Sequence, residues 1–595
     1  MKKHFYAIVF ILISLSSCKK EKKEEPTVSN FVLPPIVNVF ESYHQGTLKL
    51  NPLNATSAGD NRYNDLLPID ISKAYIEEAK SFYKTYKDSL AMYGDALLSE
   101  EEKLSKDILN WELNQALKGF TFRAELMPIN QMFSLPLTIG QLGSGSGAQP
   151  FKTVEDYKNW LKRLEKFTAW CDTAQVNMKK GIELGYVLPK SLIKKVVPQL
   201  EKLAKGKTEQ SLFFLPVKHF PGSFSKEEKN ELTHAYTSTI DNKVVPAITR
   251  LNTFIKTVYL KAGRSSSGIN AIPNGKKYYD YLIKNFTTTN MTAEEIHQLG
   301  LNEVERISME MEKVKRQVGY EEDLKSFFNH VRNKRSLIPF KNPGEVIENF
   351  KSIHEKMEPN LEKLFDLSPK TAFEIRRTEA FREASASAQY NPGSLDGTRP
   401  GIFYVPIPDV KKYNVFSDED LFLHEAIPGH HYQISLQQEN TNLPSFRKTL
   451  WYSAYGEGWA LYTESLGKEL GLYDDPYQYF GMLSAEMHRA IRLVVDTGLH
   501  VKGWSREEAI QYSLANEAES EASIISEIER YMAIPGQALS YKIGQLKIRE
   551  LRSKAENELG EKFNIKEFHN KVLESGSLPL NLLDKKINSW INSTK

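Results

Sequence analysis

The most informative stretch of the sequence is Leu421-Phe-Leu-His424-Glu425-Ala-Ile-Pro428-Gly429-His430-His431-Tyr432-Gln433. A His-Glu-x-x-His motif on a helix directs two imidazoles to one metal ion and places the Glu beside the metal-bound water. His424 and Glu425 match the first half of this motif. Position 428, where the second His would stand, is a proline, which cannot bind a metal and cannot donate a helical hydrogen bond. The stretch therefore predicts a metal site whose second histidine is displaced.

Two histidines compete for the second ligand position. On an unbroken helix His431 would point in the same direction as His424, but it would lie about 10 Å away along the axis, which is awkward for one tetrahedral ion. If Pro428 and Gly429 form a local bulge, the two extra residues are absorbed and His430 takes the second position. We favour His430 and keep His431 as the alternative.

A third ligand is expected downstream, because gluzincins take it from a Glu on a following helix. The segment Tyr455-Gly-Glu457-Gly-Trp-Ala-Leu-Tyr-Thr-Glu464 supplies Glu457 as this ligand. Glu464 follows seven residues later, so on a helix it projects to the same side and can accept a hydrogen bond from a ligand imidazole. We therefore predict one zinc ion per chain, with Glu425 as the general base on zinc-bound water. A purely structural zinc site has no use for a carboxylate at an open coordination position.

The N-terminus has the features of a targeting segment. Two lysines precede an apolar run from Phe5 to Leu15, which is too short to span a bilayer and is typical of a signal peptide over residues 1–17. Leu15-Ser-Ser-Cys18 resembles a bacterial lipobox, in which the cysteine becomes the new N-terminus and carries acyl chains. Residues 18–30 are almost free of aliphatic side chains and read as a solvated tether. We expect a lipoprotein anchored through Cys18 to a membrane of the bacterial cell envelope, on a periplasmic or surface-facing side.

Composition excludes several classes of protein. The 595 residues include 26% charged and 41% apolar side chains, which is typical of a globular chain. Lys and Arg number 78 against 75 Asp and Glu, so no excess of positive charge indicates a nucleic-acid partner. After removal of the signal peptide only Cys171 and the lipid-bearing Cys18 would remain, which leaves no thiol pair for an internal disulfide. No pattern in the sequence indicates an oligomeric state.

Apolar spacings of three and four residues dominate the chain and predict helices, as in the run Tyr157, Trp160, Leu161, Leu164 and Phe167. Thr292-Ala-Glu-Glu295 has the spacing of a capping box and predicts the start of a long amphipathic helix. The clearest strand signal is 401–408, which prolines at 400, 406 and 408 confine to a sheet edge or a short ribbon. The Gly- and Ser-rich stretch 263–275 predicts a boundary between an N-terminal helical lobe (31–270) and a C-terminal catalytic lobe (271–595).

Four blocks carry a family resemblance: HEAIPGHH, YGEGWALYTE, RLVVDTGLHVKGW and ERYMAIPGQALSYKIGQ. They resemble the signature blocks of the domain-of-unknown-function 885 (DUF885) family, bacterial proteins often predicted to be lipoproteins. They are also similar, more distantly, to blocks of thimet oligopeptidase, angiotensin-converting enzyme and the thermostable carboxypeptidases. The resemblance implies a mainly α, two-lobed gluzincin-like fold around a deep channel that admits peptides and excludes folded proteins. A small β edge is expected near the active site.

The resemblance also implies further site residues in the later blocks. In those peptidases, His and Tyr groups stabilise the tetrahedral intermediate, which assigns catalytic roles to His500 and Tyr531, with Tyr541 as second choice. Arg530 becomes a candidate for binding a peptide carboxylate, since a guanidinium can bind it through two hydrogen bonds. Arg399, just before the expected edge strand, is another candidate for this role.

Together these features predict a zinc-dependent peptidase of the carboxypeptidase or oligopeptidase type, acting on short peptides at the cell envelope. Two alternatives stay open. One is a non-catalytic ligand-binding or interaction lipoprotein on the same fold. The other is a zinc hydrolase that cleaves non-peptide amides or esters.

Overall fold

The long helices are built on the apolar spacings seen in the sequence. Tyr157, Trp160, Leu164 and Phe167 are fully buried on one face of helix α6 (Val154–Leu184). Helix α13 (Ala293–Gln317) begins at the predicted capping box, where the Thr292 hydroxyl accepts a hydrogen bond from Glu295 N–H and the Glu295 carboxylate accepts one from Thr292 N–H. The prediction of a mainly helical fold is confirmed.

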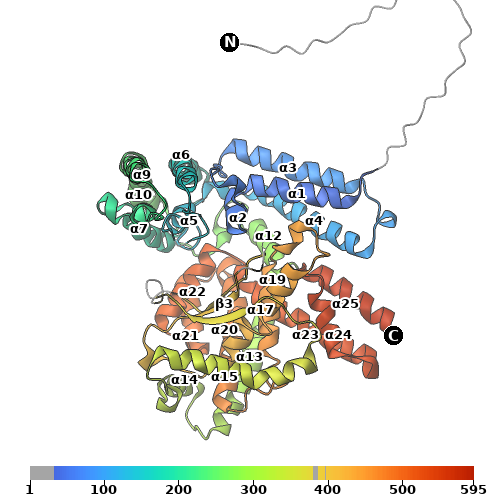
Figure 1. The fold of residues 1–595 in the computed structure, drawn as a ribbon. Helices are drawn as coiled ribbons and strands as arrows, with labels where there is room; N and C mark the ends of the chain where they lie inside the picture. Colours follow the sequence, from blue (N-terminus) through green and yellow to red (C-terminus); the bar gives the residue numbers. More distant parts are fainter. Residues whose placement is uncertain (1–32, 146, 380–382, 384–385, 396, 398) are drawn as a thin grey trace, which may run out of the picture. The chain divides into compact units, whose positions relative to one another are not determined.

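The structure is a computed structural model that describes residues 33–145, 147–379, 383, 386–395, 397 and 399–595 (Figure 1). The predicted signal peptide (1–17) and the whole predicted tether (18–30), including Cys18, lie outside the described residues. Residues Ile36–Lys595 form one unit, and the expected lobe boundary near residue 270 stays a prediction.

The helices before residue 290 are α1 (Ile36–Leu50), α2 (Pro52–Ser57), α3 (Lys73–Ala91), α4 (Glu100–Gly119), α5 (Leu135–Leu142), α6, α7 (Lys190–Ala204), α8 (Leu215–Lys218), α9 (Lys226–Thr239), α10 (Val245–Phe254), α11 (Leu260–Ala262) and α12 (Gly275–Thr287). The later helices are α13, α14 (Leu324–Asn333), α15 (Pro343–Leu364), α16 (Asp418–Glu425), α17 (His430–Glu439), α18 (Ser445–Lys448), α19 (Ser453–Glu464), α20 (Pro476–Thr497), α21 (Arg506–Asn516), α22 (Glu521–Ala533), α23 (Ser540–Leu559), α24 (Ile565–Leu573) and α25 (Leu580–Thr594). None of the described helices combines the length and the apolar composition that a membrane span requires.

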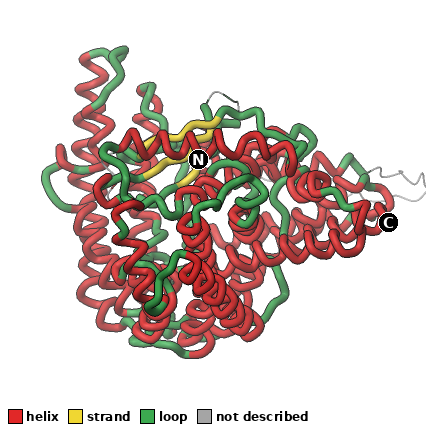
Figure 2. Tube along the Cα trace, turned by 90° about the horizontal axis from the view of Figure 1, so that it is seen from below, coloured by secondary structure: helices red, strands yellow, loops and turns green. Residues whose placement is uncertain are grey.

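A small sheet lies beside the helices, drawn in yellow in Figure 2. Its strands are β1 (Phe373–Arg377), β2 (Gln389–Asn391) and β3 (Gly401–Val405), in the order β1-β3-β2, with β1 parallel and β2 antiparallel to β3. Of the two placements predicted for the strand at 401, a sheet edge or a short ribbon, the sheet edge is wrong, because β3 is the central strand. Its prolines flank the paired residues and do not interrupt them, so the strand can pair on both sides. The edge near the site is β2.

Two helices that frame the site cross at glycines. A Cβ atom on Gly544 of α23 would lie 1.8 Å from the carbonyl oxygen of Ala454 in α19. A Cβ on Gly458 of α19 would lie 2.5 Å from the backbone of Gly544. Only glycine allows this close approach, and the crossing fixes the position of α19, which carries Glu457, against α23, which carries Tyr541.

Candidate metal centre

The segment between the two histidines breaks the helix. α16 ends at Glu425 and α17 begins at His430, so Ala426 to Gly429 form a sharp connection. A Cβ on Gly429 would lie 2.0 Å from the carbonyl oxygen of His424, so glycine alone permits the chain to fold back there. The indole N–H of Trp459, on α19, donates to the Pro428 carbonyl oxygen at 2.8 Å and ties the connection to the helix that carries Glu457.

This fold-back brings His424, His430 and Glu457 together. The Nε2 atom of His424 lies 3.6 Å from Glu457 Oε2, and Nε2 of His430 lies 3.5 Å from the same oxygen. One ligand atom from each of the three residues lies within 4.8 Å of the others. Ligands bound at 2.0–2.1 Å around a tetrahedral ion are separated by about 3.3 Å, so this set fits a small divalent metal ion. Both imidazoles are buried, and Glu457 is 16% exposed, which leaves one side of the cluster accessible.

His431 takes a different position from His430. Its Nδ1 atom lies 2.9 Å from the hydroxyl of Tyr390, and its ring packs on Phe373 with centroids 4.8 Å apart. Burial lowers the pKa of His431 to about 4, so its imidazole is neutral at physiological pH. The structure brings His430, and not His431, to His424 and Glu457.

Glu464 orients the first histidine. His424 Nδ1 lies 2.6 Å from Oε1 of the buried Glu464, so the Nδ1–H group donates to this carboxylate and the Nε2 lone pair faces Glu457. Glu457 and Glu464 lie two turns apart on α19, as their spacing predicts. Burial, together with the neighbouring Glu464 carboxylate, raises the pKa of Asp420 well above its usual range.

Glu425 lies beside the cluster at the end of α16. Its Oε2 atom accepts a hydrogen bond of 2.8 Å from the backbone N–H of Tyr390 on the edge strand β2. Burial raises the pKa of Glu425 above its usual range, whereas His424 and His430 oppose this shift. A half-buried carboxylate with one oxygen held by the backbone is suited to exchange a proton through its other oxygen.

The expected catalytic His500 is not part of this cluster. Its Nδ1 atom accepts a hydrogen bond from Ile269 N–H at 2.9 Å, and Nε2 donates to the Tyr531 carbonyl oxygen at 3.1 Å. Burial lowers the pKa of His500 to about 3, so the ring is neutral. Because both ring nitrogens bind backbone groups, His500 supports the chain locally and has no free nitrogen for a substrate.

The two tyrosines of the last block have different surroundings. The Tyr531 hydroxyl donates to Glu527 at 2.8 Å and accepts from Arg492 Nε at 3.1 Å, so its hydrogen bonds are already used. Tyr541 is partly exposed, and Arg492 lies over its ring at 4.5 Å from the centroid. Burial raises the pKa of Tyr541, and the negative charge of Glu457 raises it further.

The two candidate arginines also differ. Arg530 binds Glu527 at 3.0 Å and Gln537 at 2.6 Å, so internal partners occupy much of its guanidinium. Arg399 is exposed, and among the described residues the Pro392 carbonyl oxygen, at 2.8 Å, is the only hydrogen-bond partner of its guanidinium. Arg399 is thus the more accessible of the two.

The sequence reasoning missed three residues of this region. Trp451 is 42% exposed, although its ring packs on Gly456 and lies 5.8 Å from the ring of His430. The backbone of Tyr390 holds Glu425, which no sequence pattern indicates. Arg492 is the first residue of the third family block, RLVVDTGLHVKGW. Its position in that block was the only feature of the sequence that could have marked it as a residue of the site.

The family profile for bacterial proteins of unknown function (DUF885) matches residues 52–587. The chain belongs to the DUF885 family. A predicted lipoprotein of Colwellia psychrerythraea has a similar solved structure, with 28% identity, a TM-score of 0.85 and coverage of 94% of this chain and 99% of the other. This DUF885 protein also matches a predicted lipoprotein of unknown function from Shewanella oneidensis, at 19% identity and a TM-score of 0.74 over 93% of this chain and 99% of the other.

A carboxypeptidase from Pyrococcus furiosus aligns at 10% identity with a TM-score of 0.39 over 94% of this chain and 97% of the other. That similarity is too low to relate the two folds. No curated protein matches this DUF885 chain significantly.

Proposed function

We propose that this DUF885 protein is a zinc-dependent peptidase that hydrolyses short peptides, with His424, His430 and Glu457 as the zinc ligands. The observation that carries this proposal is the position of Glu425, which follows a ligand in sequence and is held by the Tyr390 N–H at 2.8 Å. Structural zinc sites have four protein ligands, whereas catalytic sites have three and keep one position open. Three donors next to a positioned carboxylate match the catalytic pattern.

A bound zinc ion would polarise the scissile carbonyl group and lower the pKa of a water molecule. Glu425 accepts a proton from that water and later delivers it to the nitrogen of the leaving amine as the amide C–N bond breaks. The Tyr390 N–H group holds one carboxylate oxygen in place, so the other is free for the proton. Tyr541, rather than Tyr531, is the donor for the developing oxyanion, since Tyr541 is partly exposed whereas the Tyr531 hydroxyl is bound to Glu527 and Arg492.

The substrate-binding surfaces support a peptide of broad sequence. β2 is the edge strand of the sheet, and an extended substrate backbone can lie beside it, which needs no particular side chain; the Tyr390 N–H of this strand is already bound to Glu425. Arg399, in the loop between β2 and β3, is exposed and can donate two hydrogen bonds to a terminal carboxylate. The exposed face of Trp451 offers apolar contact beside His430. These features favour carboxypeptidase or oligopeptidase action.

The proposed location is the bacterial cell envelope, with a lipid anchor at Cys18. The lipobox Leu15-Ser-Ser-Cys18 and the similarity to predicted lipoproteins support this. Cys18→Ser should move the protein from the membrane fraction to the supernatant. Equal membrane association of this variant and the parent would reject the anchor.

The test of the activity is digestion of a diverse peptide library, read by mass spectrometry, with wild type and Glu425→Gln. The variant keeps the shape and removes the base, so hydrolysis should fall at least about a hundredfold while zinc content and Tm are retained. Glu348→Gln, which changes an exposed acid on α15 that pairs with Lys351, is the matched control and should remain active. Retained activity in Glu425→Gln would exclude this mechanism.

Two other outcomes would identify the alternatives. A wild-type protein that binds zinc and cleaves no peptide, amide or ester would be a ligand-binding lipoprotein on this fold. Cleavage of a panel of non-peptide amides or esters without peptide hydrolysis would assign the same site to another substrate class.

A further inference from the structure

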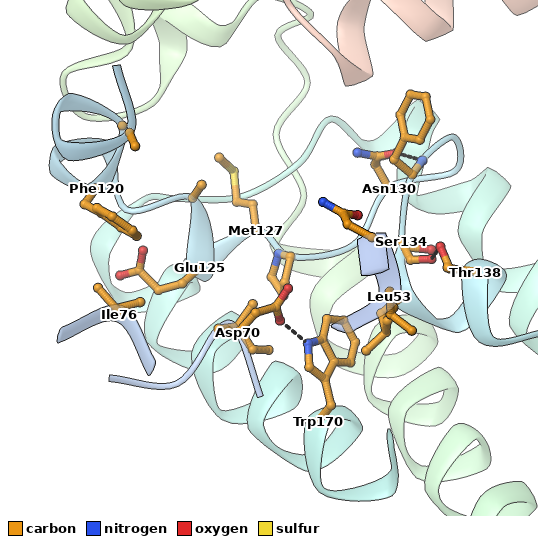
Figure 3. A pocket seen from close by; sticks show the side chains of 18 of the residues that line it. Leu53, Asp70, Ile76, Phe120, Glu125, Met127, Asn130, Ser134, Thr138 and Trp170 are labelled. Carbon is orange, nitrogen blue, oxygen red and sulfur yellow. Dashed lines mark hydrogen bonds between the residues drawn. The ribbon is translucent and has the colours of Figure 1, made fainter. Parts of the chain in front are cut away.

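A cavity of about 920 Å³ lies apart from the metal cluster, among the N-terminal helices and α12 (Figure 3). None of the three cluster residues lines it. Its size falls within the range of small-molecule sites, about 300–1,000 Å³. The cavity is therefore large enough for an organic ligand or for part of a peptide.

Aromatic and aliphatic side chains form much of the wall. The aromatic members are Phe120, Phe133, Trp170, Tyr278 and Tyr281. Polar groups such as Asn130, Ser134 and Thr138 lie along one side (Figure 3). This mixture suits a ligand with an apolar chain and one polar end.

The charged side chains of the cavity wall are all acidic. Among the described lining residues, Asp70 and Glu125 are the charged side chains, and no Lys, Arg or His lines the cavity. The Glu125 carboxylate is compensated by Arg123, whose Nε atom lies 3.2 Å away outside the wall. Asp70 forms no ion pair with any described residue. Of the two carboxylates in the wall, Asp70 is therefore the one that no cation of the described residues neutralises.

Asp70 is held firmly in this position. The buried Trp170 donates its indole N–H to Asp70 Oδ1 at 2.7 Å, as the dashed line in Figure 3 shows. Asn177, two turns further along α6, donates to the carbonyl oxygen of Ile71 at 2.8 Å. Although Asp70 is accessible to solvent, the surrounding protein removes part of its hydration and raises the pKa of its carboxyl group. A carboxylate fixed before binding loses little conformational freedom when a cation arrives.

The geometry points to a binding site for a primary ammonium group on an apolar chain, with Asp70 as the counter-ion. The ammonium replaces the lost hydration of Asp70, and the chain packs against Trp170 and Tyr281. Aromatic rings in the same cavity wall as a carboxylate favour organic cations, because the faces of the rings also attract positive charge. An amino terminus and a lysine side chain share this chemistry. Helix α12 borders the cavity and packs on α19, which carries Glu457, so the site adjoins the helices of the metal cluster.

Calorimetric titration of the purified full-length protein tests this assignment. The probe is n-hexylammonium, and n-hexanol is the uncharged analogue of similar shape. We expect saturable binding of hexylammonium and at least about tenfold weaker binding of hexanol, because hexanol cannot form the charged hydrogen bond to Asp70. Equal affinities for the two probes, or no binding of hexylammonium, would overturn the assignment.

Asp70→Asn should weaken hexylammonium binding at least about tenfold, by the loss of the same charged hydrogen bond. Glu125→Gln, which changes the other acid of the wall, should leave it nearly unchanged because Arg123 already compensates that carboxylate. If Asp70→Asn unfolds, Met127→Lys is the second variant, since it brings an ammonium group into the cavity and should abolish binding. Normal binding by a folded Asp70→Asn or Met127→Lys protein would refute the role of Asp70.

Two peptide pairs distinguish the source of the ammonium group. One pair compares a free with an acetylated amino terminus, and the other compares lysine with norleucine. If acetylation weakens binding, the amino terminus of the peptide supplies the ammonium group. If replacement of lysine by norleucine weakens binding, the lysine side chain supplies it. All titrations are repeated with Glu425→Gln, in which binding should persist, so failure of this site and failure of the peptidase proposal can be told apart.

Discussion

The Nδ1 atom of His424 lies 2.6 Å from Oε1 of Glu464, and both side chains are buried. This contact selects the tautomer in which Nε2 of His424 carries the lone pair that faces Glu457. Glu464 therefore prepares the site for a metal ion without binding it. The neighbouring Asp420, whose pKa is raised by burial, extends the buried acidic group behind the imidazole.

Glu464→Gln should weaken zinc binding by about 10- to 100-fold, the usual effect of removing a partner that orients a ligand histidine. The glutamine keeps the size of the side chain but no longer supplies a charged acceptor. Competition with a chromogenic chelator measures the affinity, and the exposed Glu348→Gln serves as control. Unchanged affinity would mean that Glu464 has no influence on the metal site.

His430→Ala should reduce the zinc content from about one ion per chain to near zero, because it removes one of three donors. His431→Ala should retain the zinc, since its Nδ1 atom binds Tyr390 and lies outside the cluster. Metal analysis by mass spectrometry of the purified proteins compares the two. The reverse pair of results would make His431 the ligand.

Tyr541→Phe should lower kcat by about 10²- to 10³-fold with little change in KM, as expected for the loss of one oxyanion donor. Tyr531→Phe should affect kcat less and lower Tm instead, because Glu527 and Arg492 lose a hydrogen-bond partner. Steady-state kinetics and calorimetry on both variants make the comparison. A larger loss of kcat in Tyr531→Phe would restore Tyr531 as the donor.

Acid should destabilise the protein through His569, a buried histidine that is not one of the proposed ligands. Burial lowers the pKa of His569 from 6.5 to about 3. Between these values the unfolded chain binds a proton that the folded chain does not, so stability is present above pH 6.5 and falls as the pH decreases. The slope per group is about 1.4 kcal/mol per pH unit.

His569→Gln removes this titration, so the loss of stability between pH 6.5 and pH 4 should be shallower than in wild type. The variant should also be less stable at neutral pH, because the imidazole bridges the Tyr462 hydroxyl and the Leu364 carbonyl oxygen at 2.8 Å each. Urea unfolding at several pH values measures both effects. Parallel pH profiles for the two proteins would contradict the assignment.

Local patterns predicted the helices and the order of the metal residues. The capping box at Thr292 and the buried face of α6 follow from spacings within one helix, where neighbours in sequence are neighbours in space. The same reason explains why the positions of Glu457 and Glu464 on one side of α19 could be expected. The position of β3 within the sheet was predicted wrongly, because its partners are distant in sequence. The paired residues of β1 precede those of β3 by 28 positions, and those of β2 precede them by 11 to 15 positions.

The sequence by itself determined the residue types of the site: an imidazole with an adjacent carboxylate, a displaced second histidine and a downstream Glu. Only the tertiary structure decided between His430 and His431, because the answer depends on how closely Gly429 approaches the His424 carbonyl. The same holds for His500, whose ring nitrogens bind backbone groups of Ile269 and Tyr531. These contacts join residues far apart in the chain, and their geometry arises from the packing of whole helices, which no local pattern encodes.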